Sequence, residues 1–279
     1  MKKLLLPFFA FFTVVVFAQT KHSCCSMSAT EQFAMLSTDD AFVSLHPDPV
    51  PFVFTPAKGT MITFKTSDGK DANAFEVRSG KPTDNWIIMV HEWWGLNDYI
   101  KQEAEKLQRE VGNVNILAID LYDGQVATTA PQAQQLMGTL KQERAVAILQ
   151  GAIADVGQMS SIYTIGWCMG GGWSLQTALL AGKQAGGCVM YYGMPEKDLS
   201  KLRNLNGDVL GIFAKKDDYI TPVVVEQFEK DMRSVNKILM VKSYDAVHAF
   251  ANPSNPNYDK EAAADAHRLV LTFLKERIR

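Results

Sequence analysis

Short apolar runs alternate with longer amphipathic segments along most of the chain, from about residue 58 onward. The expected strands cover residues 61–66, 74–78, 86–91, 114–119, 162–167, 187–192, 209–214 and 238–243. Most of these runs are almost continuously apolar, which is typical of strands that helices cover on both faces. The alternation predicts an α/β fold with a mostly parallel sheet of about eight strands and helices on both faces.

The segments between the strands have helical spacing. Ile100, Ala104, Leu107 and Val111 are four, three and four residues apart, so they lie on one face of a helix expected over 98–110. Further helices are expected over residues 131–154, 169–180, 222–235 and 260–275. No segment between strands is long enough for a large cap domain, so we expect a rather open site.

The turn between the first two strands predicts their direction. It reads Ser67-Asp68-Gly69-Lys70, a turn sequence typical of a hairpin. We therefore expect these two strands to be antiparallel and to lie at an edge of the sheet.

The first eighteen residues form a separate element. Lys2 and Lys3 precede an apolar run over 4–18 that contains Pro7, which is typical of a secretory signal peptide cleaved near Ala18. A membrane span needs roughly 20 apolar residues, so this run is too short for a stable anchor. We therefore expect an exported protein, periplasmic or extracellular, with no stable membrane insertion after cleavage.

The region over 19–58 has scattered Ser, Thr, Asp and Pro and no long periodic segment. It predicts a linker or an extension that wraps over the surface, followed by a catalytic domain over 59–279. Cys24 and Cys25 near His22 suggest metal binding, but their spacing is not that of a structural zinc site. Two thiols in a flexible leader are the better interpretation, and no metal site is expected.

Charge and cysteine content narrow the function classes. The formal net charge is -2 and the isoelectric point is about 6.2, so no basic excess indicates a nucleic-acid partner. Four cysteines in a chain of 279 residues do not form a disulfide scaffold, and Cys188 lies in an apolar run typical of the core. We expect a monomer that acts on a small molecule.

The fourth cysteine, Cys168, lies in the sequence Gly166-Trp167-Cys168-Met169-Gly170-Gly171, directly after an expected strand and before an expected helix. This is the G-x-S-x-G nucleophile elbow of α/β-hydrolases with cysteine in place of serine. The chain must reverse sharply there, so glycines are needed beside a strained nucleophile. The alternative is that Cys168 is a small core residue between glycines that serve tight packing. Because motif, strand and helix coincide, we favour a nucleophile.

In this fold an acid and then a histidine follow the nucleophile along the chain. Asp217 comes after the strand over 209–214, and His248 comes after the strand over 238–243. We expect His248 to take the thiol proton and Asp217 to orient its imidazole. Asp218 and Asp245 are alternatives for the acid.

The other histidines are weaker candidates for the base. His91 follows a core strand but precedes the nucleophile, so we interpret it as structural or as part of the pocket wall. His22 and His46 fall in the leader, and His267 falls in the last helix.

Taken together, these motifs resemble the dienelactone hydrolase family from about residue 61 to the C-terminus. The matching pieces are His91-Glu92-Trp93-Trp94-Gly95-Leu96-Asn97, Asp120-Leu121-Tyr122, Gly166 to Gly171, Tyr191-Tyr192-Gly193, the Asp217 loop and His248-Ala249-Phe250. The resemblance implies an α/β-hydrolase fold, a Cys-Asp-His triad that cleaves an enol-lactone, and no cofactor.

The resemblance also implies roles for three neighbours of the triad. Glu92 matches a carboxylate that contacts the resting thiol and helps to generate the thiolate. The backbone N–H groups of Trp93 and Met169 match an oxyanion hole, where negative charge develops on the carbonyl oxygen.

Two positions depart from the family pattern. The arginines that bind the substrate carboxylate in characterised dienelactone hydrolases correspond here to Gly124 and Asn252. Without these bidentate contacts, dienelactone itself is not the expected substrate. Trp93 and Trp94 suggest an aromatic wall for a neutral or flat substrate.

The sequence thus predicts an exported carboxylic ester hydrolase that forms an acyl-enzyme on Cys168 and needs no cofactor. An acyltransferase would use the same residues. A catalytically silent protein of the same fold would bind a ligand only, although it would not need all three triad groups. The sequence does not specify the substrate.

Overall fold

The computed structural model describes residues 27–278. The predicted signal peptide, its cleavage site, and Cys24 and Cys25 lie outside the described residues.

A single eight-stranded sheet forms the centre of the domain, in the order β1-β2-β4-β3-β5-β6-β7-β8. Its strands are β1 (Thr60–Lys65), β2 (Asp71–Val77), β3 (Asn85–Val90), β4 (Asn115–Ile119), β5 (Ser161–Trp167), β6 (Ala185–Tyr191), β7 (Asp208–Ala214) and β8 (Leu239–Tyr244). The β1–β2 and β2–β4 pairs are antiparallel and all other pairs are parallel. The predicted sheet and its hairpin at the edge are confirmed.

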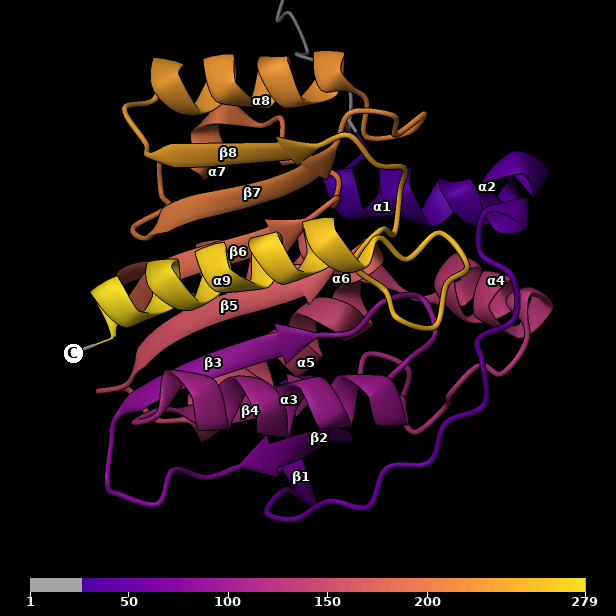
Figure 1. Cartoon of the computed structure of the whole chain (residues 1–279). Helices are drawn as coiled ribbons and strands as arrows, with labels where there is room; N and C mark the ends of the chain where they lie inside the picture. The colour runs from indigo at the N-terminus through magenta and orange to yellow at the C-terminus, as the bar shows by residue number, and fades with distance from the viewer. Residues whose placement is uncertain (1–26, 279) are drawn as a thin grey trace, which may run out of the picture.

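Helices cover both faces of the sheet (Figure 1). The helices after the N-terminal segment are α3 (Asp98–Val111), α4 (Ala130–Thr139), α5 (Gln142–Asp155), α6 (Met169–Ala181), α7 (Leu199–Leu202), α8 (Pro222–Ser234) and α9 (Lys260–Arg277). In Figure 1, α3 and α9 lie in front of the sheet, whereas α5 and α6 lie behind it. The predicted α/β architecture is therefore confirmed.

The single helix predicted over 131–154 is wrong. The chain forms α4 and α5 instead, because Leu140 is extended (φ -62°, ψ 113°). The poor helix formers Gly138 and Thr139 precede it and weaken the helix at this point. Among the helices over residues 27–278, none is both long enough and apolar enough to span a membrane.

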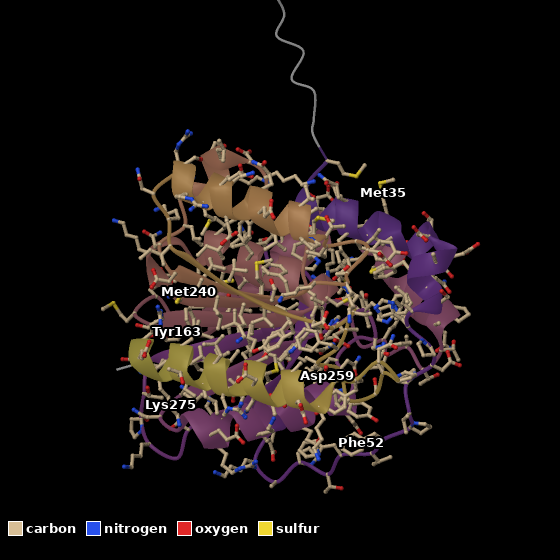
Figure 2. The ribbon with its side chains drawn as sticks, turned by 45° about the horizontal axis from the view of Figure 1, so that its top comes forward. Met35, Phe52, Tyr163, Met240, Asp259 and Lys275 are labelled. Carbon is tan, nitrogen blue, oxygen red and sulfur yellow. The ribbon has the colours of Figure 1, made fainter. Side chains whose placement is uncertain are left out.

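The N-terminal segment 27–58 contains short helices: α1 (Ala29–Ala34), the 3₁₀ helix η1 (Met35–Thr38) and α2 (Asp40–Ser44). Figure 1 shows α1 and α2 at the edge of the sheet where the parallel strands end. Phe33 and Phe42 are buried, whereas Met35 is 56% exposed and lies at the outer surface (Figure 2). The segment therefore has an apolar side that covers the end of the sheet.

After α2, the chain continues in an extended conformation alongside α3 (Figure 1). The N–H of Phe54 donates to Asp98 Oδ2 at 2.9 Å, and those of Lys58 and Gly59 donate to Glu105 Oε1 at 2.7 Å. The two carboxylates accept hydrogen bonds from backbone N–H groups that are not paired with a strand. These bonds hold the extended segment against α3.

The turn from β5 into α6 has unusual backbone geometry. Cys168 has φ 55° and ψ -121°, a conformation that non-glycine residues rarely adopt. The helix that follows approaches β3 closely: a Cβ on Gly170 would lie 2.3 Å from the carbonyl oxygen of His91 and 2.4 Å from that of Val90. Only glycine lets α6 start at this distance from the sheet.

We expect Gly170→Ala to lower the melting temperature by more than about 10 °C, because the new methyl group would overlap two backbone carbonyls that cannot move independently of β3. Gly80→Ala is the matched control, since a Cβ there meets no atom within 4 Å and should leave the melting temperature nearly unchanged. Thermal unfolding followed by circular dichroism measures both. Equal melting temperatures for the two variants would contradict this account of the turn.

Candidate active site

Three side chains from separate loops meet at the carboxyl edge of the sheet. Cys168 lies at the start of α6, Asp217 follows β7 and His248 follows β8. His248 Nδ1 lies 2.6 Å from Asp217 Oδ2, and His248 Nε2 lies 3.3 Å from Cys168 Sγ. The structure therefore joins the three predicted triad residues in one chain of hydrogen bonds.

The site is closed rather than open. The exposed fractions of Cys168, Asp217 and His248 are 1%, 3% and 2%. The prediction of a rather open site is wrong. It was based on the absence of a large cap domain between the strands, but another part of the chain buries the triad. The N-terminal segment covers the site instead.

The position of Asp217 distinguishes it from the other candidate acids. Its Oδ1 accepts hydrogen bonds from the N–H groups of Tyr219 and Ile220, both at 2.9 Å, which leaves Oδ2 for His248. Asp218 is exposed, and Asp245 pairs with Lys216 at the surface. Of the three acids, Asp217 is therefore the one that the structure brings to His248.

Burial and charge act in opposite directions on this pair. Burial tends to raise the pKa of Asp217, but the charge of His248 and the hydrogen bonds lower it overall. Burial tends to lower the pKa of His248, but the Asp217 carboxylate and the Cys168 thiolate raise it to about 10. The site therefore stabilises the imidazolium that forms when His248 accepts a proton.

The thiol is also perturbed by its surroundings. Burial raises the pKa of Cys168, although His248 and the backbone N–H of Met169 act to lower it. Met169 is the first residue of α6, so its N–H has no partner within the helix. Trp93 is fully buried in the loop after β3. The oxyanion-hole role of Met169 and Trp93 stays a prediction.

Glu92 lies in the same loop and is 8% exposed. Tyr192 donates from its hydroxyl group to Glu92 Oε1 at 3.4 Å, and the side-chain amide of Asn252 donates to Oε2. Burial raises the pKa of Glu92 to about 7, against the lowering effects of His248 and both hydrogen bonds. These partners are not the thiol contact that the family resemblance implies, and the thiol-activating role of Glu92 stays a prediction.

Asn252 occupies one of the two positions where the family pattern has arginine. Besides its bond to Glu92, its Oδ1 accepts hydrogen bonds from the N–H of Ser254 at 2.8 Å and from the hydroxyl of Ser254 at 2.7 Å. Gly124 occupies the other position, in the turn where its N–H donates to Asp120 Oδ2 at 2.5 Å. Neither residue offers a cation to a substrate.

His91, the competing histidine, has a structural position. It is fully buried, its Nε2 accepts a hydrogen bond from the N–H of Leu121 at 3.0 Å, and its Nδ1 donates to the carbonyl oxygen of Glu92 at 2.5 Å. Burial lowers its pKa. It therefore links the loops that follow β3 and β4.

The N-terminal segment adds residues that sequence reasoning missed. The ring centroids of Phe33, Phe42 and His46 lie 6.3, 5.8 and 5.4 Å from that of His248. His46 was not predicted to lie at the site, because it falls in the region expected to be a leader. The signal in the sequence is the presence of large apolar side chains such as Phe33 and Phe42 in a segment with many polar residues and prolines.

A cavity of about 570 Å³ lies between α3 and α9. Glu92, Trp94, Trp167, Tyr191 and Asn252 are among the residues that line it. Neither Cys168 nor His248 is among its described lining residues. Tyr192 donates to Glu92, and its ring centroid lies 5.0 Å from that of His248. Glu92 therefore lies between the cavity and the triad.

Possible metal ligands gather at one place within residues 27–278. His46, Cys168 and His248 each offer a ligand atom, and these atoms lie within 4.8 Å of one another.

Comparison with known proteins shows the relatives of this chain. The chain is 27% identical to a carboxymethylenebutenolidase of Pseudomonas sp. strain P51, over 68% of this chain and 83% of that protein. It is 26% identical to carboxymethylenebutenolidase 1 of Cupriavidus pinatubonensis, over 74% of this chain and 93% of that protein.

The fold also matches solved structures. One is the dienelactone hydrolase-like promiscuous phosphotriesterase P91 from metagenomic libraries, with a TM-score of 0.67 and 22% identity over 80% of this chain and 100% of that chain. The model of the dienelactone hydrolase family matches residues 73–278, and the chain therefore belongs to this family.

Proposed function

We propose that this member of the family hydrolyses a neutral carboxylic ester or lactone through a thioester on Cys168. The observation that carries the proposal is the hydrogen-bonded chain Asp217–His248–Cys168, which begins at a strained strand-to-helix turn. Three side chains from separate loops meet there with the geometry that nucleophilic catalysis requires. The family relatives named for carboxymethylenebutenolidase activity support the ester or lactone class.

The reaction proceeds in two halves. His248 Nε2 takes the thiol proton while Cys168 Sγ bonds to the substrate carbonyl carbon, and the proton then passes to the leaving alkoxide as the carbon–oxygen bond breaks. In the second half, His248 takes a proton from water and the resulting hydroxide attacks the thioester. The carboxylic acid product leaves and the proton returns to the thiolate, so Cys168 is regenerated.

The surroundings of the thiol favour the charges that form during these steps. Asp217 stabilises the imidazolium of His248 at a distance of 2.6 Å. The N–H groups of Met169 and Trp93 serve as the oxyanion donors, and the N-terminus of α6 adds a positive partial charge at the thiol. No cofactor is required.

The residues around the cavity support a neutral substrate. A substrate carboxylate placed near Asn252 would face Glu92 without a guanidinium to offset the repulsion. The cavity of about 570 Å³ is lined there by Trp94, Trp167 and Tyr191, whose rings suit an apolar acyl or alcohol group.

Burial of the triad supports an acyltransferase as a second candidate. Cys168 and His248 are almost inaccessible to solvent, so an alcohol bound in the cavity can compete with water for the thioester. The two functions differ in the products formed when a primary alcohol is added to the assay.

Export through the N-terminal sequence is part of the same proposal. A thiolate outside the cytoplasm is prone to oxidation, and oxidation requires access to the sulfur. The 1% exposed fraction of Cys168 is consistent with a nucleophile that is shielded while no substrate is bound.

We expect Cys168→Ala to lower kcat for p-nitrophenyl ester hydrolysis at least about 1,000-fold, because it removes the nucleophile. Cys188→Ala is the matched control. Cys188 is also a buried thiol, but its sulfur contacts the hydroxyl of Ser174 instead of a histidine, so this variant should keep its activity. Reduced protein should be assayed with short esters and a panel of small lactones. Equal activity in wild type and Cys168→Ala would contradict the proposed nucleophile.

The raised pKa of Glu92 predicts a feature of the pH profile. If the ionised carboxylate helps to remove the thiol proton, kcat/KM should rise with pH through about 7, as Glu92 loses its proton. Glu92→Gln should lack this rise, because its amide does not titrate.

Glu196→Gln is the control for this measurement, because Glu196 is another buried carboxylate, paired with Lys201 instead of lying at the triad. The control should keep the wild-type profile. A rise near pH 7 that persists unchanged in Glu92→Gln would exclude Glu92 as its source.

A further inference from the structure

We propose that His46, Cys168 and His248 form a site for a soft divalent metal ion of the zinc type, and that the bound metal silences the nucleophile reversibly. The binding part of this inference rests on the geometry of the three side chains alone. The silencing part rests on the function proposed above.

The state of His46 is the first observation. Its Nδ1 lies 2.8 Å from the carbonyl oxygen of Phe42 and donates to it, so Nε2 carries the lone pair. His46 is only 2% exposed, yet Nε2 has no hydrogen-bond partner. A polar atom that is buried without a hydrogen-bond partner destabilises the folded state. A histidine retained in this state points to a ligand for Nε2.

The second observation is the separation of the three ligand atoms. Zinc bonds of about 2.0–2.1 Å to nitrogen and about 2.3 Å to sulfur place tetrahedral ligands about 3.3–3.6 Å apart. His248 Nε2 and Cys168 Sγ are already 3.3 Å apart, and all three ligand atoms lie within 4.8 Å of one another. A shift of about 1 Å, within the reach of side-chain rotation, closes the set around a metal.

The outer contacts of both histidines are those of metal ligands. His248 donates from Nδ1 to the Asp217 carboxylate at 2.6 Å, and His46 donates from Nδ1 to a backbone carbonyl. Such bonds fix the tautomer and turn Nε2 toward a metal. The Cys168 thiolate and the Asp217 carboxylate together offset the two positive charges of the ion, so the buried site is neutral when loaded.

A donor for a fourth ligand is also present. Trp93 Nε1 is buried without a hydrogen-bond partner, and its ring centroid lies 4.8 Å from that of His46. The Trp93 ring therefore packs against His46, and its unpartnered N–H can donate to a water or anion bound to the metal.

A metal ion at this site would bind the two atoms that the hydrolysis reaction uses, Cys168 Sγ and His248 Nε2. On metal binding, the Cys168 thiol loses its proton to solvent and Sγ gives a lone pair to the ion, while His248 gives the lone pair on Nε2. The nucleophile and the base are then both occupied. His46 lies outside residues 73–278, which match the family model, so the N-terminal segment adds the third ligand to the family's site.

Direct metal binding tests the first part of the inference. The full chain carrying Cys24→Ser and Cys25→Ser, which removes the thiols near the N-terminus, is titrated under reducing conditions with Co²⁺ and then Zn²⁺. We expect one equivalent of Co²⁺ to give a thiolate charge-transfer band, and Zn²⁺ to displace it. Calorimetry gives the affinity for Zn²⁺ alone.

Variants of that protein assign the ligands. Cys168→Ser should abolish the band, and His46→Phe should weaken Zn²⁺ binding at least about tenfold, because one of three protein ligands is lost. His46→Asn repeats the test without adding an apolar ring, and circular dichroism checks that both variants are folded. Cys188→Ser and His267→Phe are controls that should bind as tightly as the parent protein.

The outcomes separate the two parts of the inference. Absence of the band, or equal affinity in folded His46→Phe and His46→Asn and their parent, would overturn the metal site. Loss of ester hydrolysis at one equivalent of Zn²⁺, restored by a chelator, is the result expected for silencing. Tight His46-dependent binding with full hydrolysis would overturn silencing, and binding by a protein without hydrolase activity would count against the proposed function only.

Discussion

The sharp turn at Cys168 is the constraint on which the rest of the site depends. Its positive φ of 55° projects the thiol from the end of β5, while the missing side chain of Gly170 lets α6 start against β3. A non-glycine residue in this conformation costs of order 1–3 kcal/mol, which the packing of α6 between the sheet and α1 must offset. The same turn places Sγ 3.3 Å from His248 Nε2. It also places the N–H of Met169, which has no partner within α6, beside the thiol.

Closure of this site by the N-terminal segment has electrostatic consequences. Phe33 and Phe42 replace solvent around His248, so charges interact there at a lower effective dielectric constant. The lower dielectric constant strengthens the interaction between Asp217 and His248. Burial also acts on Glu92, whose pKa it raises to about 7. The proposed hydrolase site and the proposed metal site therefore share one buried arrangement, and His248 takes part in both.

The sequence predicts the sheet well because buried strands and amphipathic helices have different periods. It also predicts that Cys168 and His248 lie close together. Both residues follow parallel strands, and the carboxyl ends of parallel strands lie at the same edge of a sheet. It leaves Asp217 and Asp218 as alternatives, because only the turn that bonds Asp217 Oδ1 to Tyr219 and Ile220 decides which carboxylate faces inward. The approach of His46 to His248 joins residues some 200 positions apart, and no local pattern encodes such a contact.

Trapping the acyl-enzyme tests the central claim most directly. Reduced protein is mixed with an activated ester, quenched in acid, which preserves thioesters, and analysed by intact-mass and peptide mass spectrometry. The account predicts a mass increase equal to the acyl group, located on the peptide that contains Cys168, which forms and decays at the rate of turnover. Turnover with the acyl group on another residue, or with Cys168 unmodified throughout, would contradict it.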